Sequence, residues 1–477
     1  MKPFPETTAP PTTPQDSAPE IPSLHPPIPP SPASLSQRAA ALTRRALDKL
    51  PGGSFTRSVT VLAGGTALGQ AITIAAAPLL TRLYTPDDFG VLGVYASLLA
   101  IFTVVASLRY ELAIPLPDKD KNAAPVLVVA LTLVPIVSIL LAILLWLFHA
   151  NLLHWMNAPF LAPYLWLLPI GVLLTGTYQV FSYWAVRRKA FSHIAQTKLN
   201  QGVASVLIQI ALFPLGAYGL LLGRIARNTA GLTTLLTLAW KRDRKAFLDL
   251  STQDATTAAR RYRRFPKYSA LAGLANSAGL QLPALLLAAY YGPFVVGQFV
   301  LVQRVAGWPL HLIGQAISQV YFGRAAETFR SSPKVFYRLF LQLTLRLALI
   351  AILPVGLLIL AGPWLFSAVF GNQWSTAGHY ATILAIMLFA QFIVSPLSAT
   401  LSILERQSWI LFWNVLRLTS VTLALSVAFW VDATDTATIA AYATTMTACY
   451  ACRFLLDLLA FSRSSRALSH LQTVSHP

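Results

Sequence analysis

The sequence predicts an all-α, polytopic membrane protein with about twelve transmembrane helices in two six-helix lobes related by a parallel repeat. Hydrophobic residues make up 55% of the chain and charged residues only 11%, against about 25% charged residues in soluble proteins. Twelve long apolar runs follow one another, and most have the roughly 20 residues that a helix needs to cross the hydrocarbon core. The expected spans are residues 59–80, 91–113, 123–148, 161–184, 199–215, 219–240, 268–290, 294–318, 339–362, 379–403, 408–430 and 437–462. This composition excludes a globular enzyme with a single anchor.

Lysine and arginine are concentrated in every other gap between these runs. If the N-terminus is cytoplasmic, the cytoplasmic segments hold 28 of the 36 Lys and Arg residues, whereas the external gaps hold only Arg82. Cytoplasmic loops of membrane proteins carry such an excess of positive charge, so both termini are predicted to be cytoplasmic. The same bias accounts for most of the net charge of +19, which therefore does not indicate nucleic acid as a partner. The basic cluster within residues 260–267 is expected to meet anionic membrane lipids.

The longest polar gap divides the spans into two sets of six. Residues 1–32 hold 12 of the 32 prolines and little apolar material, which is typical of a disordered tail. This tail lacks the layout of a signal peptide, so the first span is expected to remain uncleaved. The predicted segments are a Pro-rich cytoplasmic tail at 1–56, an N-terminal six-helix lobe at 57–240, a basic cytoplasmic linker at 241–267, a C-terminal six-helix lobe at 268–463 and a cytoplasmic tail at 464–477. We refer to the two lobes as the N-terminal half and the C-terminal half.

A short motif occurs at the same place in both halves. Tyr84, Pro86 and Gly90 (in YTPDDFG) reappear 207 residues later as Tyr291, Pro293 and Gly297 (in YGPFVVG), and each copy links the first helix of its half to the second. Six helices reverse direction an even number of times, so the two halves have the same orientation. Three matches in seven residues also arise by chance in turn-rich loops, but the equivalent position favours a parallel repeat. In transporters such a repeat places the substrate path between the halves.

The expected spans contain seven arginines but only two acidic residues. One of these acids, Asp457, is expected to pair with Arg453 four residues before it. Arg304 differs, because it stands ten residues into the eighth span, roughly 15 Å deep, with no acidic residue nearby in sequence. His311 and Gln315 follow on the same helical face. Ionisable groups inside a membrane usually face a cavity or a partner, so this face predicts a cationic lumen for an anionic substrate.

Four further spans carry polar groups that could line the same lumen. Arg224 and Arg227 lie in the sixth span, Arg417 in the eleventh, Gln70 in the first and Asn276 in the seventh. The predicted substrate-binding residues are Arg304, Arg227, Arg224, Arg417, His311, Gln315, Gln70 and Asn276. Hydrogen bonds between helices, worth about 0.6 kcal/mol each, are an equally good explanation for the amides. Such hydrogen bonds are a poor explanation for the presence of the arginines within the spans.

Motifs for enzymatic chemistry are absent from the sequence. It contains no phosphate-binding loop, no GxSxG and no HExxH, so we expect no cofactor and no bound metal. Energy for transport would come from an ion gradient, the membrane potential or consumption of the product. Asp87 and Asp88 could form a metal-binding pair of a membrane glycosyltransferase, but a helix cap is the simpler interpretation. Cys449 and Cys452 are expected to pack as small residues in the last span.

Two stretches of the sequence resemble a known family. Residues 82–114 read RLYTPDDFGVLGVYASLLAIFTVVASLRYELAI, and residues 265–327 read FPKYSALAGLANSAGLQLPALLLAAYYGPFVVGQFVLVQRVAGWPLHLIGQAISQVYFGRAAE. Both are similar to bacterial oligosaccharide flippases related to lipopolysaccharide and exopolysaccharide biosynthesis proteins, and both fall at matching places in the two halves. The resemblance covers about residues 57–463 and does not include the Pro-rich tail.

The resemblance implies a specific function. The wider superfamily, which includes drug and lipid II exporters, has two six-helix bundles in a V shape and a central cationic cavity that receives pyrophosphate. The substrate would be a glycan repeat unit on undecaprenyl pyrophosphate, carried from the cytoplasmic to the periplasmic leaflet of the bacterial inner membrane by alternating access. The expected partners are membrane lipids, a polysaccharide polymerase and glycosyltransferases. Two alternatives remain open: a small-molecule or drug exporter, and a membrane glycosyltransferase that would use Asp87 or Asp88 with a divalent metal.

Overall fold

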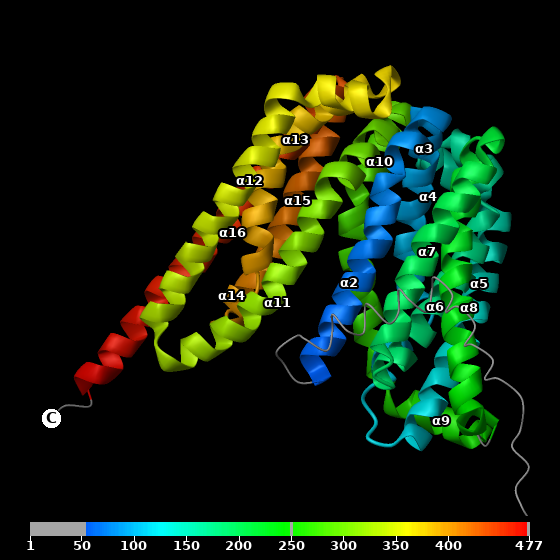
Figure 1. Ribbon diagram of the computed structural model, residues 1–477, viewed down its shortest axis with the longest axis horizontal. Helices are drawn as coiled ribbons and strands as arrows, with labels where there is room; N and C mark the ends of the chain where they lie inside the picture. Colours follow the sequence, from blue (N-terminus) through cyan, green and yellow to red (C-terminus); the bar gives the residue numbers. More distant parts are fainter. Residues whose placement is uncertain (1–53, 249–250, 475–477) are drawn as a thin grey trace, which may run out of the picture. The chain divides into compact units, whose positions relative to one another are not determined.

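The computed structural model describes residues 54–248 and 251–474, and this part of the chain is helical without any strand (Figure 1). The α-helices are α2 (Ser54–Ala75), α3 (Ala77–Leu83), α4 (Pro86–Val105), α5 (Asp120–Trp155), α6 (Leu167–Arg187), α7 (Phe191–Ala211), α8 (Ala217–Leu248), α9 (Thr252–Arg261), α10 (Ala270–Val302), α11 (Trp308–Ser331), α12 (Pro333–Phe370), α13 (Ser375–Val394), α14 (Thr400–Ile403), α15 (Gln407–Trp430) and α16 (Asp435–Val474). Short helical turns are η1 (Tyr110–Ala113), η2 (Pro159–Tyr164), η3 (Phe213–Leu215), η4 (Phe265–Ser269), η5 (Gln303–Gly307), η6 (Asn372–Trp374) and η7 (Ser395–Leu397). The predicted all-α fold class is confirmed.

Each predicted span overlaps helical residues, but 91–113 runs past the end of α4 at Val105, and the spans 59–80, 161–184, 199–215 and 219–240 are not among the stretches that are long and apolar enough to cross a membrane. Seven stretches of the described residues are long and apolar enough to cross a membrane, and one of them, Phe265–Phe329, contains both the seventh and the eighth predicted span. Large apolar side chains on the outer helices point away from the protein: Trp146 on α5 is 78% exposed and Leu360 on α12 is 87% exposed. Such side chains are stable when lipid surrounds them, because lipid tails are as apolar as the side chains themselves.

The boundary between the seventh and eighth spans is a glycine. The backbone of α10 leaves helical geometry at Gly292, where φ is +78°. This left-handed conformation is easily adopted by glycine and costly for residues with a Cβ. A second irregularity follows at η5, a π-helical turn between α10 and α11 that carries Arg304. Single π-turns are frequent at functional sites.

Parts of the predicted linker and tails are helical. The linker at 241–267 contains the end of α8 and the whole of α9, which begins with a capping box between Ser251 and Asp254. The Tyr110 hydroxyl of η1 donates a hydrogen bond to the Ala259 carbonyl and holds α9 in place (2.9 Å). Most of the tail at 1–56 lies outside the described residues, although α2 begins at Ser54. In the C-terminal tail, α16 continues to Val474.

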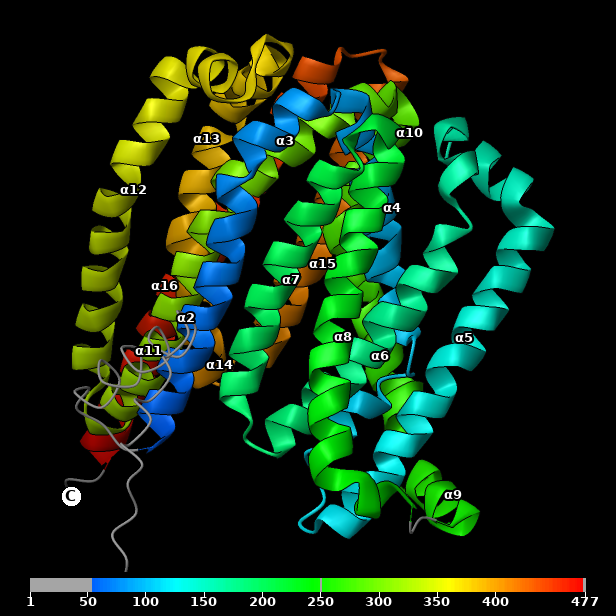
Figure 2. The same ribbon diagram turned by 45° about the vertical axis from the view of Figure 1, so that its right-hand side comes forward.

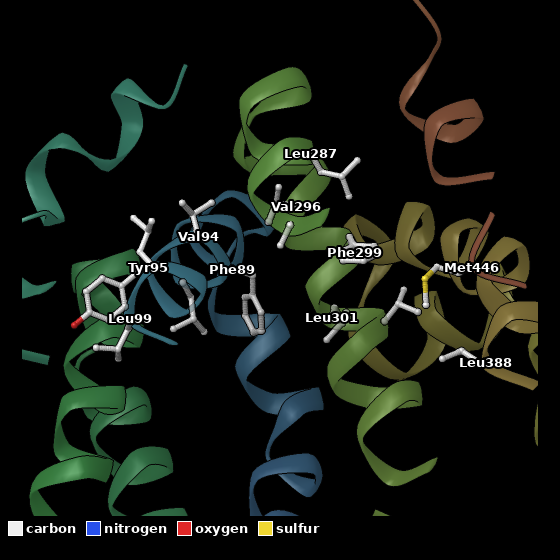
Figure 3. Packing of buried hydrophobic residues seen from close by; sticks show 14 of the residues in the cluster. Phe89, Val94, Tyr95, Leu99, Leu287, Val296, Phe299, Leu301, Leu388 and Met446 are labelled. Atoms are coloured by element: carbon white, nitrogen blue, oxygen red, sulfur yellow. The ribbon is translucent and has the colours of Figure 1, made fainter. Parts of the chain in front are cut away.

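The two copies of the repeated motif pack against each other where α4 meets α10 (Figure 3). A Cβ on Gly90 would overlap the carbonyl of Pro293, and a Cβ on Gly297 would overlap the carbonyl of Pro86. Because each glycine lacks a Cβ, the backbone of the proline in the other copy can approach it closely. Buried side chains flank this contact on both helices, among them Phe89 on α4.

The two motif tyrosines also make equivalent contacts. The Tyr84 hydroxyl donates to the Gln209 carbonyl near the end of α7 (2.5 Å), and the Tyr291 hydroxyl donates to the Ala433 carbonyl just after α15 (2.9 Å). Helices α7 and α15 carry the fifth predicted span of their respective halves. The motif thus has the same role twice, as a repeat requires.

Candidate anion-binding site

Three of the predicted arginines lie near one another among the helices of the two halves. Arg224 and Arg227 lie on α8 in the N-terminal half, and Arg304 lies on η5 in the C-terminal half. The positive charges of Arg224 and Arg227 both act on Arg304, and that of Arg227 acts on Arg224. All three side chains are partly exposed. We call these three residues the arginine cluster.

Arg304 reaches across to the N-terminal half. Its Nη2 donates to the Thr73 carbonyl on α2 (3.5 Å), and its guanidinium lies 5.9 Å from the centre of the Phe89 ring on α4. Arginine over an aromatic face is stabilised by the ring quadrupole. The π-turn at η5 therefore places one C-terminal cation between two helices of the other half.

The arginine cluster has no acidic partner among the residues that the structure describes. The ion pairs there join Arg109 to Glu111, Arg187 to Asp120, Arg188 to Asp120 and Asp243, and Arg453 to Asp457. The Nε of Arg224 is also buried without a hydrogen-bond partner. A guanidinium at the centre of a membrane helix costs on the order of 3 kcal/mol. An anion between the three groups would offset much of that cost.

Arg417 lies elsewhere, in the C-terminal half. Its guanidinium is 4.9 Å from the centre of the Trp413 ring, and Arg453 lies 5.5 Å from the same ring. The Trp413 indole donates to the Cys449 carbonyl (2.7 Å), and Arg453 forms the predicted pair with Asp457 (3.5 Å). These contacts join α15 to α16, so Arg417 is not placed with the arginine cluster and its role in binding remains a prediction.

The predicted amides and histidine are not gathered at one point. Gln70 on α2 is partly exposed, and Asn276 on α10 and Gln315 on α11 are exposed. Beside Asn276, the Ser277 hydroxyl donates to the Ala100 carbonyl (3.2 Å), which is a bond between helices. Helix α11 includes residue 311, but the side chain of His311 is outside the described residues. A role of these four residues in binding stays a prediction.

Asp88 caps a helix, as the simpler interpretation predicted. It forms a capping box with Thr85 at the start of α4: the Thr85 hydroxyl accepts from the Asp88 backbone (3.2 Å), and the Asp88 carboxylate accepts from the Thr85 backbone (2.9 Å). Asp87 is exposed. The described residues contain no group of three or more His, Cys, Asp or Glu side chains that could hold a metal ion.

The arginine cluster has polar neighbours that the sequence did not single out. The Lys198 ammonium on α7 lies 5.3 Å from the centre of the Tyr178 ring on α6, and Tyr178 lies close enough to Arg227 for the two side chains to interact electrostatically. Gln201, one turn after Lys198, is buried. Lys198 directly precedes the fifth predicted span at 199–215, and it is already helical because α7 begins at Phe191.

Reciprocal hydrogen bonds join the two halves beyond the repeated motifs. Asn157, after the third helix of the N-terminal half, donates to the Ala289 carbonyl at the end of the seventh span (2.8 Å). Gln373, after the third helix of the C-terminal half, donates to the Thr81 carbonyl at the end of the first span (2.7 Å). The Trp374 indole donates to the same carbonyl (2.8 Å). We call these three side chains the clasp.

Comparisons with known proteins agree with this architecture. The sequence profile of the family described as polysaccharide biosynthesis protein matches residues 79–379, more than half of the chain. No curated protein sequence matches. Several solved structures share the fold at low sequence identity, and three of them are described below.

An inward-facing conformation of a multidrug resistance MATE family transporter of the MOP superfamily is 13% identical with a TM-score of 0.61, over 89% of this chain and 99% of that one. A MOP superfamily transporter from Pyrococcus furiosus Vc1, in which a reversed polarity of the binding pocket suggests a different function, is 15% identical with a TM-score of 0.55, over 86% and 96%. A MATE in the bent conformation is 13% identical with a TM-score of 0.53, over 87% and 97%. The fold is that of MOP superfamily transporters, and the chain belongs to the polysaccharide biosynthesis protein family.

Proposed function

We propose that this protein is a flippase that moves undecaprenyl-pyrophosphate-linked oligosaccharide repeat units from the cytoplasmic to the periplasmic leaflet of the bacterial inner membrane. The product would supply surface polysaccharide, such as O-antigen or exopolysaccharide. The observation that carries this proposal is the arginine cluster, in which three cations of both halves converge without an acidic partner among the described residues. Family membership supports the same conclusion.

Pyrophosphate fits the chemistry of the arginine cluster. A guanidinium presents a planar set of donors that matches phosphate oxygens in pairs. Arg224 and Arg227 would bind from the N-terminal half and Arg304 from the C-terminal half, so the bound pyrophosphate would join the two halves. Binding in this position would change the relative stability of conformations that separate the halves differently. This is the requirement for alternating access.

The distribution of basic residues favours a topology with the clasp on the periplasmic side and with α9 and both termini on the cytoplasmic side. The conformation described here would therefore be closed to the periplasm, and the substrate would enter from the cytoplasmic leaflet. Opening to the periplasm would require the clasp bonds to break. The glycosyltransferases that build the repeat unit and the polymerase that consumes it would act before and after this step.

Replacing Gln373 with Ala should shift the protein towards a conformation that is open to the periplasm. The change removes bonds to the carbonyls of Thr81 and Tyr84 (2.7 and 3.2 Å), each worth about 1 kcal/mol. Spin labels at positions 166 and 364, where Trp166 and Trp364 are 58% and 70% exposed, would report the separation of the halves. Both native cysteines would first be replaced.

We expect the Q373A variant to populate longer distances, with a change of at least about fivefold in the conformational equilibrium. Asn414→Ala, which removes an exposed amide from α15, is the matched control and should leave the distances unchanged. If the Q373A distances equal those of the wild type, the hydrogen bonds of Gln373 do not hold the halves together.

A drug exporter of the same superfamily is the second candidate, because structures with this fold include multidrug transporters. A cationic site would repel cationic drugs and attract the anionic lipid-linked glycan. Purified protein in liposomes should therefore flip the lipid-linked repeat unit extracted from the host strain and should not move a cationic dye. Movement of the dye without movement of the glycan would replace the flippase proposal with the exporter.

A further inference from the structure

Three polar side chains of α6 and α7 lie beside the arginine cluster and pack against α8, and the three helices lie side by side (Figure 2). Tyr178 and Gln201 both contact Gly231 on α8: a Cβ there would lie 3.0 Å from Cδ2 of Tyr178 and would overlap the amide of Gln201. Lys198 covers the Tyr178 ring at 5.3 Å. Because Gly231 has no side chain, the Gln201 amide and the Tyr178 ring can both pack against the backbone of α8.

Two polar atoms of this group have no hydrogen-bond partner among the described residues. The Tyr178 hydroxyl and the Gln201 Oε1 are both buried and unpaired, and the two residues are only 8% and 2% exposed. Two other buried tyrosines are paired: the Tyr84 hydroxyl donates to the Gln209 carbonyl and the Tyr95 hydroxyl to the Leu167 carbonyl. Buried polar groups are nearly always satisfied, so an unsatisfied hydroxyl beside an unsatisfied amide requires an explanation.

The position of the group connects it to the proposed pyrophosphate site. Arg227 precedes Gly231 by one helical turn on α8, and it lies close enough to Tyr178 for the two side chains to interact electrostatically. Asn228 donates to the Thr175 hydroxyl on α6 (2.6 Å) and fixes α8 against α6 at this level. A ligand whose phosphate lies on Arg227 would therefore present its neighbouring chemical group to Tyr178 and Gln201.

We propose that Tyr178, Gln201 and Lys198 form a subsite for the sugar that is bonded directly to the pyrophosphate. The inference rests on the proposed function and adds the recognition of the glycan. The Gln201 amide oxygen would accept a hydrogen bond from one sugar hydroxyl, and the Tyr178 hydroxyl would form a hydrogen bond with a second sugar hydroxyl. The apolar face of the sugar would pack on the aromatic ring and displace the Lys198 side chain, whose ammonium would then donate to a sugar oxygen. Sites of this kind combine apolar surface with a few placed polar groups.

The decisive variant is Tyr178→Phe, compared with Tyr95→Phe. The first removes a hydroxyl without a protein partner, so the Tm should stay the same or rise. The second removes a hydroxyl that donates to the Leu167 carbonyl (3.0 Å), so the Tm should fall. This difference separates a binding role of the Tyr178 hydroxyl from a structural one.

Binding would be measured on the purified full chain with two probes: undecaprenyl pyrophosphate, and the lipid-linked repeat unit extracted from the host strain. We expect the wild type to bind the sugar-bearing lipid at least about tenfold more tightly, a difference of about 1.4 kcal/mol. Y178F should lose most of this preference while its Kd for undecaprenyl pyrophosphate stays the same. Gln201→Leu should behave like Y178F, and Y95F should retain the preference.

Equal binding of the two lipids by the wild type, or a full preference in both Y178F and Q201L, would overturn the sugar subsite and leave the pyrophosphate site standing. A wild type that binds neither lipid would instead overturn the proposed function. The two failures are therefore distinguishable.

Discussion

Arg304→Ala should abolish flipping while the protein still inserts and accumulates in the membrane. Among the described residues, Arg304 makes one long hydrogen bond, to the Thr73 carbonyl (3.5 Å), and lies over the Phe89 ring (5.9 Å), so little folding energy depends on it. Its removal leaves Arg224 and Arg227, both of one half, to hold the pyrophosphate. Losing one member of a buried, hydrogen-bonded charge pair costs about 2–5 kcal/mol, so affinity should fall by at least roughly 30-fold.

Two further variants make this result specific. Arg304→Lys retains the charge but not the planar pair of donors, and we expect partial activity. Arg346→Ala removes an exposed arginine of α12, which also lies within a predicted span, and should leave flipping unchanged. The measurements are the flipping rate in liposomes and the amount of protein in the membrane fraction. Normal flipping by R304A would contradict the role assigned to the arginine cluster.

Gly297→Ala should prevent the protein from folding stably. The new Cβ would overlap the Pro86 carbonyl and lie 3.0 Å from the Gly90 nitrogen, and both are backbone atoms of α4 that cannot rotate away. Overpacking a tight contact costs about 1–3 kcal/mol and more where the backbone must move. We expect a loss of at least about 3 kcal/mol. The readout is a fall in Tm and in the yield of monodisperse protein.

The reciprocal variant Gly90→Ala should have the same effect, because its Cβ would overlap the Pro293 carbonyl. Gly356→Ala is the matched control: this glycine lies in α12 with nothing within 4 Å of a Cβ. Alanine is the better helix former by about 1 kcal/mol, so G356A should be neutral or stabilising. If G90A and G297A tolerate the change as well as G356A does, the two motifs do not pack as closely as described.

The repeat motif and the arginines were predictable because each leaves a local signal. Gly90 and Gly297 stand at equal offsets from a tyrosine and a proline, and the structure shows why glycine is required at both. Arg304, Arg224 and Arg227 lack an acidic residue one helical turn away, which is unusual inside a membrane. The helix cap at Asp88 was equally local, since capping depends on residues three positions apart.

Features that depend on tertiary packing could not be predicted. Asn157 and Gln373 occupy equivalent loops but share no sequence motif, so their reciprocal bonds appear only when the halves are placed together. Whether a polar residue is satisfied is equally invisible in the sequence: Gln201 and Gln281 look alike there, yet only Gln281 accepts a hydrogen bond at its Oε1, from Ser97 (3.2 Å). Arg417 stacks on Trp413, one turn before it. The absence of an acidic neighbour in the sequence therefore does not show that an arginine lacks a partner.

The most direct test of the flippase is the location of the lipid-linked glycan in a strain that lacks this protein. The account predicts that complete repeat units accumulate on undecaprenyl pyrophosphate in the cytoplasmic leaflet, that surface polysaccharide disappears, and that the wild-type gene but not the R304A variant restores it. Incomplete repeat units, or complete units waiting on the periplasmic side, would contradict the account and indicate a transferase or a polymerase.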